Sequence, residues 1–198
     1  MNTESKYAKD IRSRSTFRFL KGLYPRTKKY IIQRYISSVA RKNGAHIGEC
    51  VTMPYKLAKK ANSNLIVGNH TSIQTDLIDL RSKVIIGNHV IIGSGVEIIT
   101  CSHNIDSPDW EFKSYGLEIE DYCWIATRAF ILPSCQLIGH GAICAAGAVV
   151  FKNVEIMSIV SGNPAKHLKY RKQTHTDLIV ESMLGNDLIA YLKAYKLK

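Results

Sequence analysis

The chain has 198 residues, of which 45% are hydrophobic, and a mean hydropathy of −0.08. These values are typical of one globular core domain with terminal additions. No apolar run approaches the roughly 20 residues that a membrane-spanning helix needs, and the first residues lack the apolar core of a signal peptide. A cytoplasmic protein is therefore expected. The net charge is +11, which excludes a strongly acidic protein.

Residues 1–43 carry almost all of this charge, with twelve Lys or Arg against Glu4 and Asp10. They are expected to form a basic N-terminal cap of two short helices, broken at Gly22 and Pro25. The second helix has an apolar stripe made of Ile31, Ile32, Tyr35, Ile36 and Val39. Such a segment can cover the end of a core, and its charge can attract an anionic membrane or an anionic glycan. No nucleic-acid-binding motif accompanies the charge, so no nucleic acid is expected.

Residues 44–165 show a repeat of six residues. An aliphatic residue or Cys heads each repeat, and a small or slim side chain follows four positions later in most of them. The heads are Val67, Ile73, Ile86, Ile92, Ile98, Ile119, Ile125, Ile131, Ile138, Cys144 and Val150. A period of six fits neither a helix nor a simple alternating strand. It is typical of a solenoid in which each hexapeptide forms one short strand and one turn.

The repeat is interrupted at residues 53–64 and 103–117, which we expect to be loops that leave the coil. One extra residue lies between Pro133 and Ile138, and a local bulge would absorb it. Residues 166–198 are expected to form a C-terminal helical tail interrupted at Gly185-Asn186.

The five cysteines form no CxxC pair and no zinc-ligand spacing. Cys123 and Cys135 occupy the slim position of the repeat, and Cys144 occupies the head position. We expect them to pack in the interior as small hydrophobic residues, without disulfides and without a metal.

Linked motifs follow one another in the second half of the chain. They are GLEIEDYCWIA at 116–126, FILP at 130–133, IGHGAI at 138–143, AAGAVVFKNV at 145–154 and GNPAK at 162–166. Together they resemble the hexapeptide-repeat acyltransferases, and within these the sugar O-acetyltransferases of bacterial surface-polysaccharide synthesis. The resemblance covers residues 66–171. It implies a mainly β protein, a left-handed parallel β-helix with helical N- and C-terminal additions, assembled as a homotrimer with acetyl-CoA between subunits.

Acetyl transfer to a hydroxyl needs a base, because a hydroxyl is a weak nucleophile near neutral pH, and histidine suits this task. His103 opens the second interruption, where the family has its catalytic histidine. The resemblance also implies that Trp124 lines the thioester end of the donor site, where its indole N–H could donate to the reacting centre. His89 and His140 occupy turn positions, and we assign them no role.

The donor site is expected to use small residues beside the pantetheine arm and basic residues beside the phosphates. Ala126 and Ala145 are 19 residues apart, so they should stack on successive coils. The full set of expected donor residues is Trp124, Ala126, Ala145, Ala146, Lys152, Asn163, Pro164, Lys166 and Arg171.

The acceptor sugar is expected to meet aromatic and polar side chains of the second interruption, with one residue from a neighbouring subunit. These residues are Asn104, Asp106, Trp110, Tyr115 and Asp76. Glu118 is a candidate to orient the ring of His103.

The leading function is O-acetylation of a sugar in a surface polysaccharide or its precursor. Its alternatives are N-acetylation of an amino-sugar nucleotide and a non-catalytic hexapeptide scaffold. Serine acetylation is disfavoured because no long N-terminal helical domain is evident. A carbonic-anhydrase-type metal site needs two histidines five residues apart, and the residue five after His103 is Pro108. Because lipid-linked glycans are assembled at the inner leaflet, peripheral association with the plasma membrane through residues 1–43 is expected.

Overall fold

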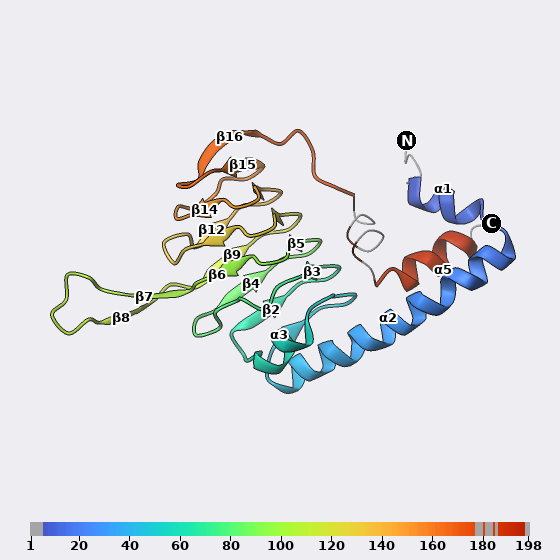
Figure 1. Ribbon diagram of the computed structural model, residues 1–198, viewed down its shortest axis with the longest axis horizontal. Helices are drawn as coiled ribbons and strands as arrows, with labels where there is room; N and C mark the ends of the chain where they lie inside the picture. The colour runs from blue at the N-terminus through green and yellow to red at the C-terminus, as the bar shows by residue number, and fades with distance from the viewer. Residues whose placement is uncertain (1–5, 177–179, 181–183, 185, 197–198) are drawn as a thin grey trace.

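The computed structural model describes residues 6–176, 180, 184 and 186–196. Its core is a column of short strands in three sheets, with helices at one side and one end (Figure 1). Sheet A contains β1 (His46–Ile47), β2 (Leu65–Val67), β4 (Val84–Ile86), β9 (Leu117–Ile119) and β12 (Leu137–Ile138). Sheet B contains β3 (Ser72–Ile73), β5 (Ile91–Ile92), β10 (Trp124–Ile125), β13 (Ile143–Cys144), β15 (Ser158–Ser161) and β16 (Lys166–Tyr170). Sheet C contains β6 (Glu97–Ile98), β11 (Phe130–Ile131) and β14 (Val149–Val150).

Along the column the chain passes from sheet A to sheet B, from B to C, and from C back to A. Apart from the antiparallel pair β15–β16, neighbouring strands in these sheets are parallel, and Trp124, for example, pairs with Ile91 on one side and Ile143 on the other. The turns therefore gather along three edges of the column, and each edge is named by the two sheets that it joins. The AB edge comprises residues 68–71, 87–90, 120–123 and 139–142. The BC edge comprises residues 74–77, 93–96, 126–129, 145–148 and 162–165, and the CA edge comprises residues 99–116, 132–136 and 151–153.

The six-residue pattern places its side chains as predicted. Each head of the repeat is the last residue of a strand and is at most 3% exposed. The slim residues of the same repeats, including Cys123, Cys135 and Ala142, are also buried. The heads and slim residues belong to a single hydrophobic cluster that runs through the column. Burial of this surface is the main driving force for the fold.

The extra residue after Pro133 lies in a turn on the CA edge rather than in a bulged strand. Strand β12 keeps its regular register, with Ile138 opposite Ile119. The side-chain oxygen of Asn153 accepts hydrogen bonds from the backbone N–H groups of Gln136 and Leu137, at 2.8 and 3.1 Å. The turn thus absorbs the insertion without leaving these amides unpaired.

The N-terminal helices differ from the expectation. Helix α1 (Lys6–Arg12) is short, and α2 (Thr16–Lys42) runs without a break through Gly22 and Pro25. Helix α5 (Leu188–Lys196) packs against α1 and α2, and a Cβ atom at Gly22 would collide with Tyr191 of α5. Glycine at this position therefore permits close helix packing instead of ending the helix.

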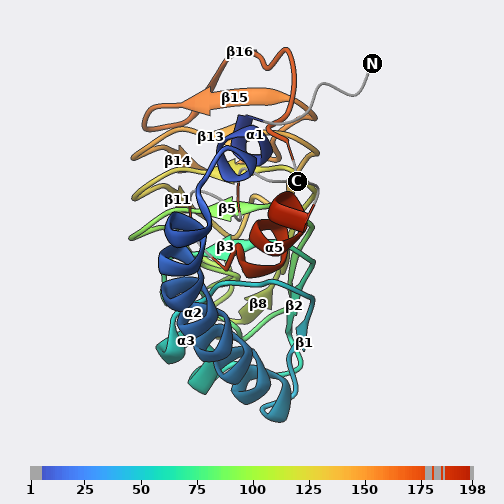
Figure 2. The same cartoon turned by 90° about the vertical axis from the view of Figure 1, so that its right-hand side faces the viewer.

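The C-terminal half of α2 and helix α3 (Tyr55–Lys60) lie at the start of the column. Ile36 and Ala40 of α2 and Leu57 of α3 belong to the main core cluster. Figure 2 shows α2 and α5 on the side of the molecule where sheet B lies. None of the helices in the described part of the chain is long and apolar enough to cross a membrane.

The C-terminal segment begins differently from the expected helical tail. Residues 166–170 form strand β16, which pairs antiparallel with β15. Asn186 adopts a left-handed conformation just before α5, whereas Gly185 lies outside the described residues.

Candidate functional site

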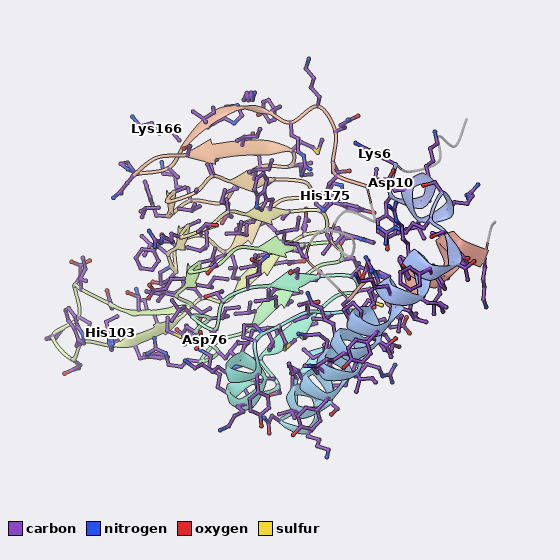
Figure 3. The ribbon with its side chains drawn as sticks, turned by 45° about the vertical axis from the view of Figure 1, so that its right-hand side comes forward. Lys6, Asp10, Asp76, His103, Lys166 and His175 are labelled. Atoms are coloured by element: carbon purple, nitrogen blue, oxygen red, sulfur yellow. The ribbon has the colours of Figure 1, made fainter. Side chains whose placement is uncertain are left out.

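The interruption at residues 103–117 is a two-stranded hairpin rather than an irregular loop. Strands β7 (Cys101–His103) and β8 (Phe112–Ser114) pair antiparallel, with His103 opposite Phe112. The hairpin leaves the column at the CA edge, between β6 and β9, and projects well beyond it (Figure 1). In Figure 3, His103 lies on this projection.

The imidazole of His103 is held in one orientation by the hairpin itself. Its Nδ1 lies 2.7 Å from the backbone oxygen of Trp110. A carbonyl oxygen can only accept, so Nδ1 carries the proton and the neutral ring keeps its lone pair on Nε2. The ring also stacks on the Trp110 indole at 5.5 Å and meets the edge of Phe112 at 5.8 Å between centroids. The exposed Nε2 is thereby prepared to accept a proton.

The orienting partner of His103 is therefore the Trp110 carbonyl and not Glu118. Glu118 lies in β9, where it pairs with Ile85 and Leu137 within sheet A. A backbone carbonyl has no side-chain signature, so the sequence pattern pointed instead to a nearby carboxylate.

A second group of residues, which the sequence analysis did not identify, contacts the hairpin at Phe112. Arg81 binds Asp79 through two hydrogen bonds of 2.9 Å, and its guanidinium lies 5.8 Å from the centre of the Phe112 ring. Oδ2 of Asp79, which accepts one of these bonds, also accepts a hydrogen bond from the backbone N–H of Thr100. These contacts connect Asp79, through Arg81 and Phe112, to the ring of His103.

The pKa of the Asp79 carboxyl group lies well below its ordinary value. Partial burial opposes its ionisation, but hydrogen bonds from Arg81 and Thr100 outweigh this effect and lower the carboxyl pKa from 3.8 to about 2. A lowered pKa means that the carboxylate stabilises the folded chain above pH 3.8. This contribution is lost as the pH falls from 3.8 towards 2.

Replacing Asp79 by Asn is expected to loosen the hairpin. With His103 as the expected base, the rate of acetyl transfer should then fall by about tenfold, since a base held less firmly is less often in position. The KM for the acyl donor should not change, because the BC edge is untouched. Asp109→Asn, on an exposed hairpin carboxylate, is the matched control.

Denaturant unfolding gives a second measurement of the same change. The wild type should be the more stable protein at pH 7, and the difference from Asp79→Asn should shrink as the pH falls from 3.8 towards 2. A difference in unfolding free energy that is independent of pH would contradict this role.

The residues predicted to bind the acceptor divide between two places. Asp106, Trp110 and Tyr115 are exposed on the hairpin with His103, and Asn104 shapes the tip by accepting from the backbone N–H of Asp106. Asp76 instead lies on the BC edge, between β3 and the bridge at Ile78. Sheet C therefore separates Asp76 from the hairpin.

The expected donor residues lie mainly along the BC edge. Trp124 is 45% exposed on the outer face of β10, two residues before Ala126. The backbone N–H of Ala126 donates to Cys144 at 2.8 Å, and that of Ala145 donates to Val160 at 2.9 Å. Because the sheet uses both amides, neither N–H is available to a ligand, and the small side chains leave room beside the backbone. Ala146 is exposed next to them.

Asn163 and Pro164 continue the BC edge, and Lys166 begins β16 at the same edge. In Figure 3, Lys166 lies near the far end of the column from α2. All three residues are exposed. This end of the edge is thus open and carries a positive charge, as a phosphate site requires.

Two expected donor residues lie elsewhere. Lys152 follows β14 on the CA edge. Arg171 lies beyond the opposite end of β16 from Lys166, on the AB edge, where its guanidinium donates to the backbone oxygens of Tyr122 and Gly141 at 3.1 Å. Partial burial lowers the pKa of Arg171. Arg171 therefore joins turns of the column and does not belong to the group on the BC edge.

Buried thiols offer no alternative nucleophile in the column. Burial raises the pKa of Cys123 to about 12 and that of Cys135 to about 11, and it also raises the pKa of Cys144. Within the described residues, no group of three or more His, Cys, Asp or Glu side chains is arranged to hold a metal ion.

No family model matches the chain. The chain is 26% identical over 145 residues to the putative colanic acid biosynthesis acetyltransferase WcaF of Escherichia coli K12, an alignment that covers 73% of this chain and 79% of the relative. It is 32% identical over 134 residues to a chloramphenicol acetyltransferase of Klebsiella aerogenes, covering 57% of this chain and 63% of that protein.

Among solved structures, a hexapeptide-repeat containing acetyltransferase from Vibrio cholerae superposes with a TM-score of 0.60 and 25% identity, covering 85% of this chain and 95% of that one. Its complex with acetyl coenzyme A superposes with a TM-score of 0.56 and 23% identity, covering 84% of each chain.

Proposed function

We propose that this chain transfers an acetyl group from acetyl-CoA to a sugar hydroxyl of a bacterial surface polysaccharide or its precursor. The proposal is supported by its similarity to hexapeptide-repeat acetyltransferases and to the putative colanic acid biosynthesis acetyltransferase WcaF. The observation that carries this proposal is His103. Its Nδ1 is engaged by the Trp110 carbonyl, and its Nε2 is exposed among aromatic and polar side chains of the kind that bind sugars.

In the proposed reaction, Nε2 of His103 removes the proton of the acceptor hydroxyl while the oxygen attacks the thioester carbonyl. The resulting tetrahedral intermediate carries a negative oxygen, and the indole N–H of Trp124 is a candidate donor to it. When the intermediate collapses, the carbon–sulfur bond breaks. The imidazolium then returns its proton to the leaving thiolate, so His103 acts as base and then as acid.

We also propose that the column is a left-handed β-helix, divided into a basic cap at 1–43, a β domain from 44 and a C-terminal tail whose first residues extend that domain to 170. Homotrimers would complete the active site. In a single chain the hairpin lies on the CA edge and the donor group lies on the BC edge, with sheet C between them. A hairpin that projects from one subunit can reach the BC edge of the next, which joins the two halves.

A second candidate function is acetylation of a small hydroxyl compound of the chloramphenicol kind. It is favoured by the 32% identity to the Klebsiella aerogenes protein of that name. The same hairpin base would serve, and the aromatic side chains of Trp110 and Tyr115 would meet a nitrophenyl ring instead of a sugar.

Release of CoA thiol from acetyl-CoA tests these functions directly. The acceptors are surface polysaccharides, their oligosaccharides, amino-sugar nucleotides, serine and chloramphenicol. Release that depends on a glycan is the expected result. Release with an amino-sugar nucleotide alone would establish the N-acetyltransferase, and release with chloramphenicol alone would establish the second candidate. No release with any acceptor, together with no binding of acetyl-CoA, would leave a scaffold.

A further inference from the structure

Helix α2 has an apolar stripe that faces away from the rest of the molecule. Its members are exposed over 45% to 76% of their surface, and they are Phe17, Leu20, Tyr24, Ile31, Ile32 and Tyr35. At about 100° per residue they fall within one sector roughly 120° wide. No other described element covers this sector except at its end, where Tyr35 stacks on Tyr55 at 6.3 Å. Figure 1 shows α2 along the border of the molecule.

The opposite face of α2 prevents the helix from rotating the stripe inward. Ile36 and Ala40 are buried in the main core. Phe19 is buried in a second cluster, where it stacks on Tyr191 at 4.9 Å. Arg26 also binds Asp187 at 2.9 Å. The stripe therefore stays on the surface of the chain, and a group of large exposed apolar side chains of this kind marks an interaction site.

The charges around the stripe are of one sign. The 27 residues of α2 include eight Lys or Arg and no Asp or Glu. Lys21 and Lys28 lie within the apolar sector, and Arg18 and Arg34 lie at its two borders. The aliphatic part of each of these side chains can lie beside apolar groups while its charged end remains in a polar environment.

We propose that α2 docks flat on an anionic phospholipid surface, with the stripe at the boundary between headgroups and acyl chains. The helix is about 40 Å long, and an amphipathic helix with cations beside its apolar face binds in the plane of such a surface. This inference does not depend on the acyl acceptor or on the chemistry of His103.

Charge and shape exclude the other occupants. A second copy would bring another face on which α2 carries Arg18, Lys21, Lys28 and Arg34 and no acidic side chain, and the two faces would repel. An anionic glycan or a nucleic acid would satisfy the charges but would leave Leu20, Ile31 and Ile32 without an apolar partner. An anionic lipid surface matches both features.

Vesicle sedimentation tests this surface with the full-length protein. The vesicles contain either phosphatidylcholine alone or phosphatidylcholine with 40% phosphatidylglycerol. We expect binding to the anionic vesicles, reduced at least tenfold in the triple variant Leu20→Ser, Tyr24→Ser, Ile31→Ser. The double variant Lys21→Gln, Lys28→Gln should lose about fivefold for each lysine, and added salt should weaken the binding of the wild type.

The matched control changes three equally exposed apolar side chains elsewhere, as Ile105→Ser, Ile156→Ser, Leu168→Ser, which are 77%, 60% and 62% exposed. It should bind vesicles as the wild type does. Circular dichroism and light scattering of each variant monitor folding and assembly. Unchanged vesicle binding in the folded triple variant would overturn the proposal. So would a change of molecular mass in that variant without vesicle binding by the wild type, which would identify the stripe as a contact between copies.

Discussion

Replacing His103 by Ala is expected to lower the rate of CoA release in the presence of acceptor by about 10²- to 10⁴-fold, the usual contribution of a general base. The loss should appear in kcat, because in the proposed reaction His103 acts on the acceptor hydroxyl and does not hold acetyl-CoA. Binding of acetyl-CoA, measured by calorimetry, should remain within about twofold of the wild type. The oligomeric state should not change, because the His103 side chain is exposed and lies outside the core.

His46→Ala is the matched control for this prediction. His46 is also an exposed histidine in a short strand, but it lies in β1 at the other end of the column from Lys166. Its replacement should leave the rate unchanged. A wild-type rate in His103→Ala would contradict the base assignment, and equal losses in both variants would indicate a general effect on folding.

Co-production of two inactive variants is expected to restore activity. His103→Ala removes the base, and Ala146→Trp fills the donor groove with a large side chain at an exposed position that folding should tolerate. If each site takes its hairpin from one subunit and its BC edge from the next, random mixing at equal amounts leaves about a quarter of the sites intact. We therefore expect about 25% of the wild-type rate for the unfractionated mixture and about a third for purified mixed trimers, in which one site of three is intact.

The comparison needs two different affinity tags, so that mixed trimers can be purified through both. Each variant alone should remain inactive in the same assay. Mixed trimers that are no more active than the variants alone would show that the hairpin and the BC edge act within one chain, and would overturn the proposed assembly.

The strands of the column could be predicted from the sequence. Ile125, Ile131 and Ile138 end β10, β11 and β12, as the period of six indicated. The prediction succeeds because the inward-facing position, and the volume available to its side chain, recur at the same place in every turn of the column. The positions of the strands can therefore be predicted from the local sequence pattern. The position of the extra residue after Pro133 could be predicted for the same reason.

The helices show where local signals fail. Gly22 and Pro25 predicted a break, yet α2 continues through both. Within it, Arg26 donates to the Gly22 carbonyl at 2.9 Å, and Gly22 lies against Tyr191 of α5. Packing against an element about 170 residues away outweighed the local preference of two residues, which a single window of sequence cannot register.

The candidate site, too, could be predicted only in part from the sequence. The resemblance in the motifs selected His103, Trp124 and the alanines of the BC edge, because each belongs to a short run with its own repeat position. The placement of these groups on two different edges depends on how the circuits stack. No spacing in the sequence shows that distribution.

By itself, the sequence determined the repeat, the buried side chains and the point where the column is interrupted, since all three follow from local periodicity. Only the tertiary structure decided that the interruption is a hairpin, that the Trp110 carbonyl holds His103 and that Asp79 supports it through Arg81. The physical reason is that these contacts use a backbone carbonyl, which has no side-chain signature, or side chains that meet only in the folded chain, such as Arg81 and Phe112. Neither kind of contact follows the six-residue repeat.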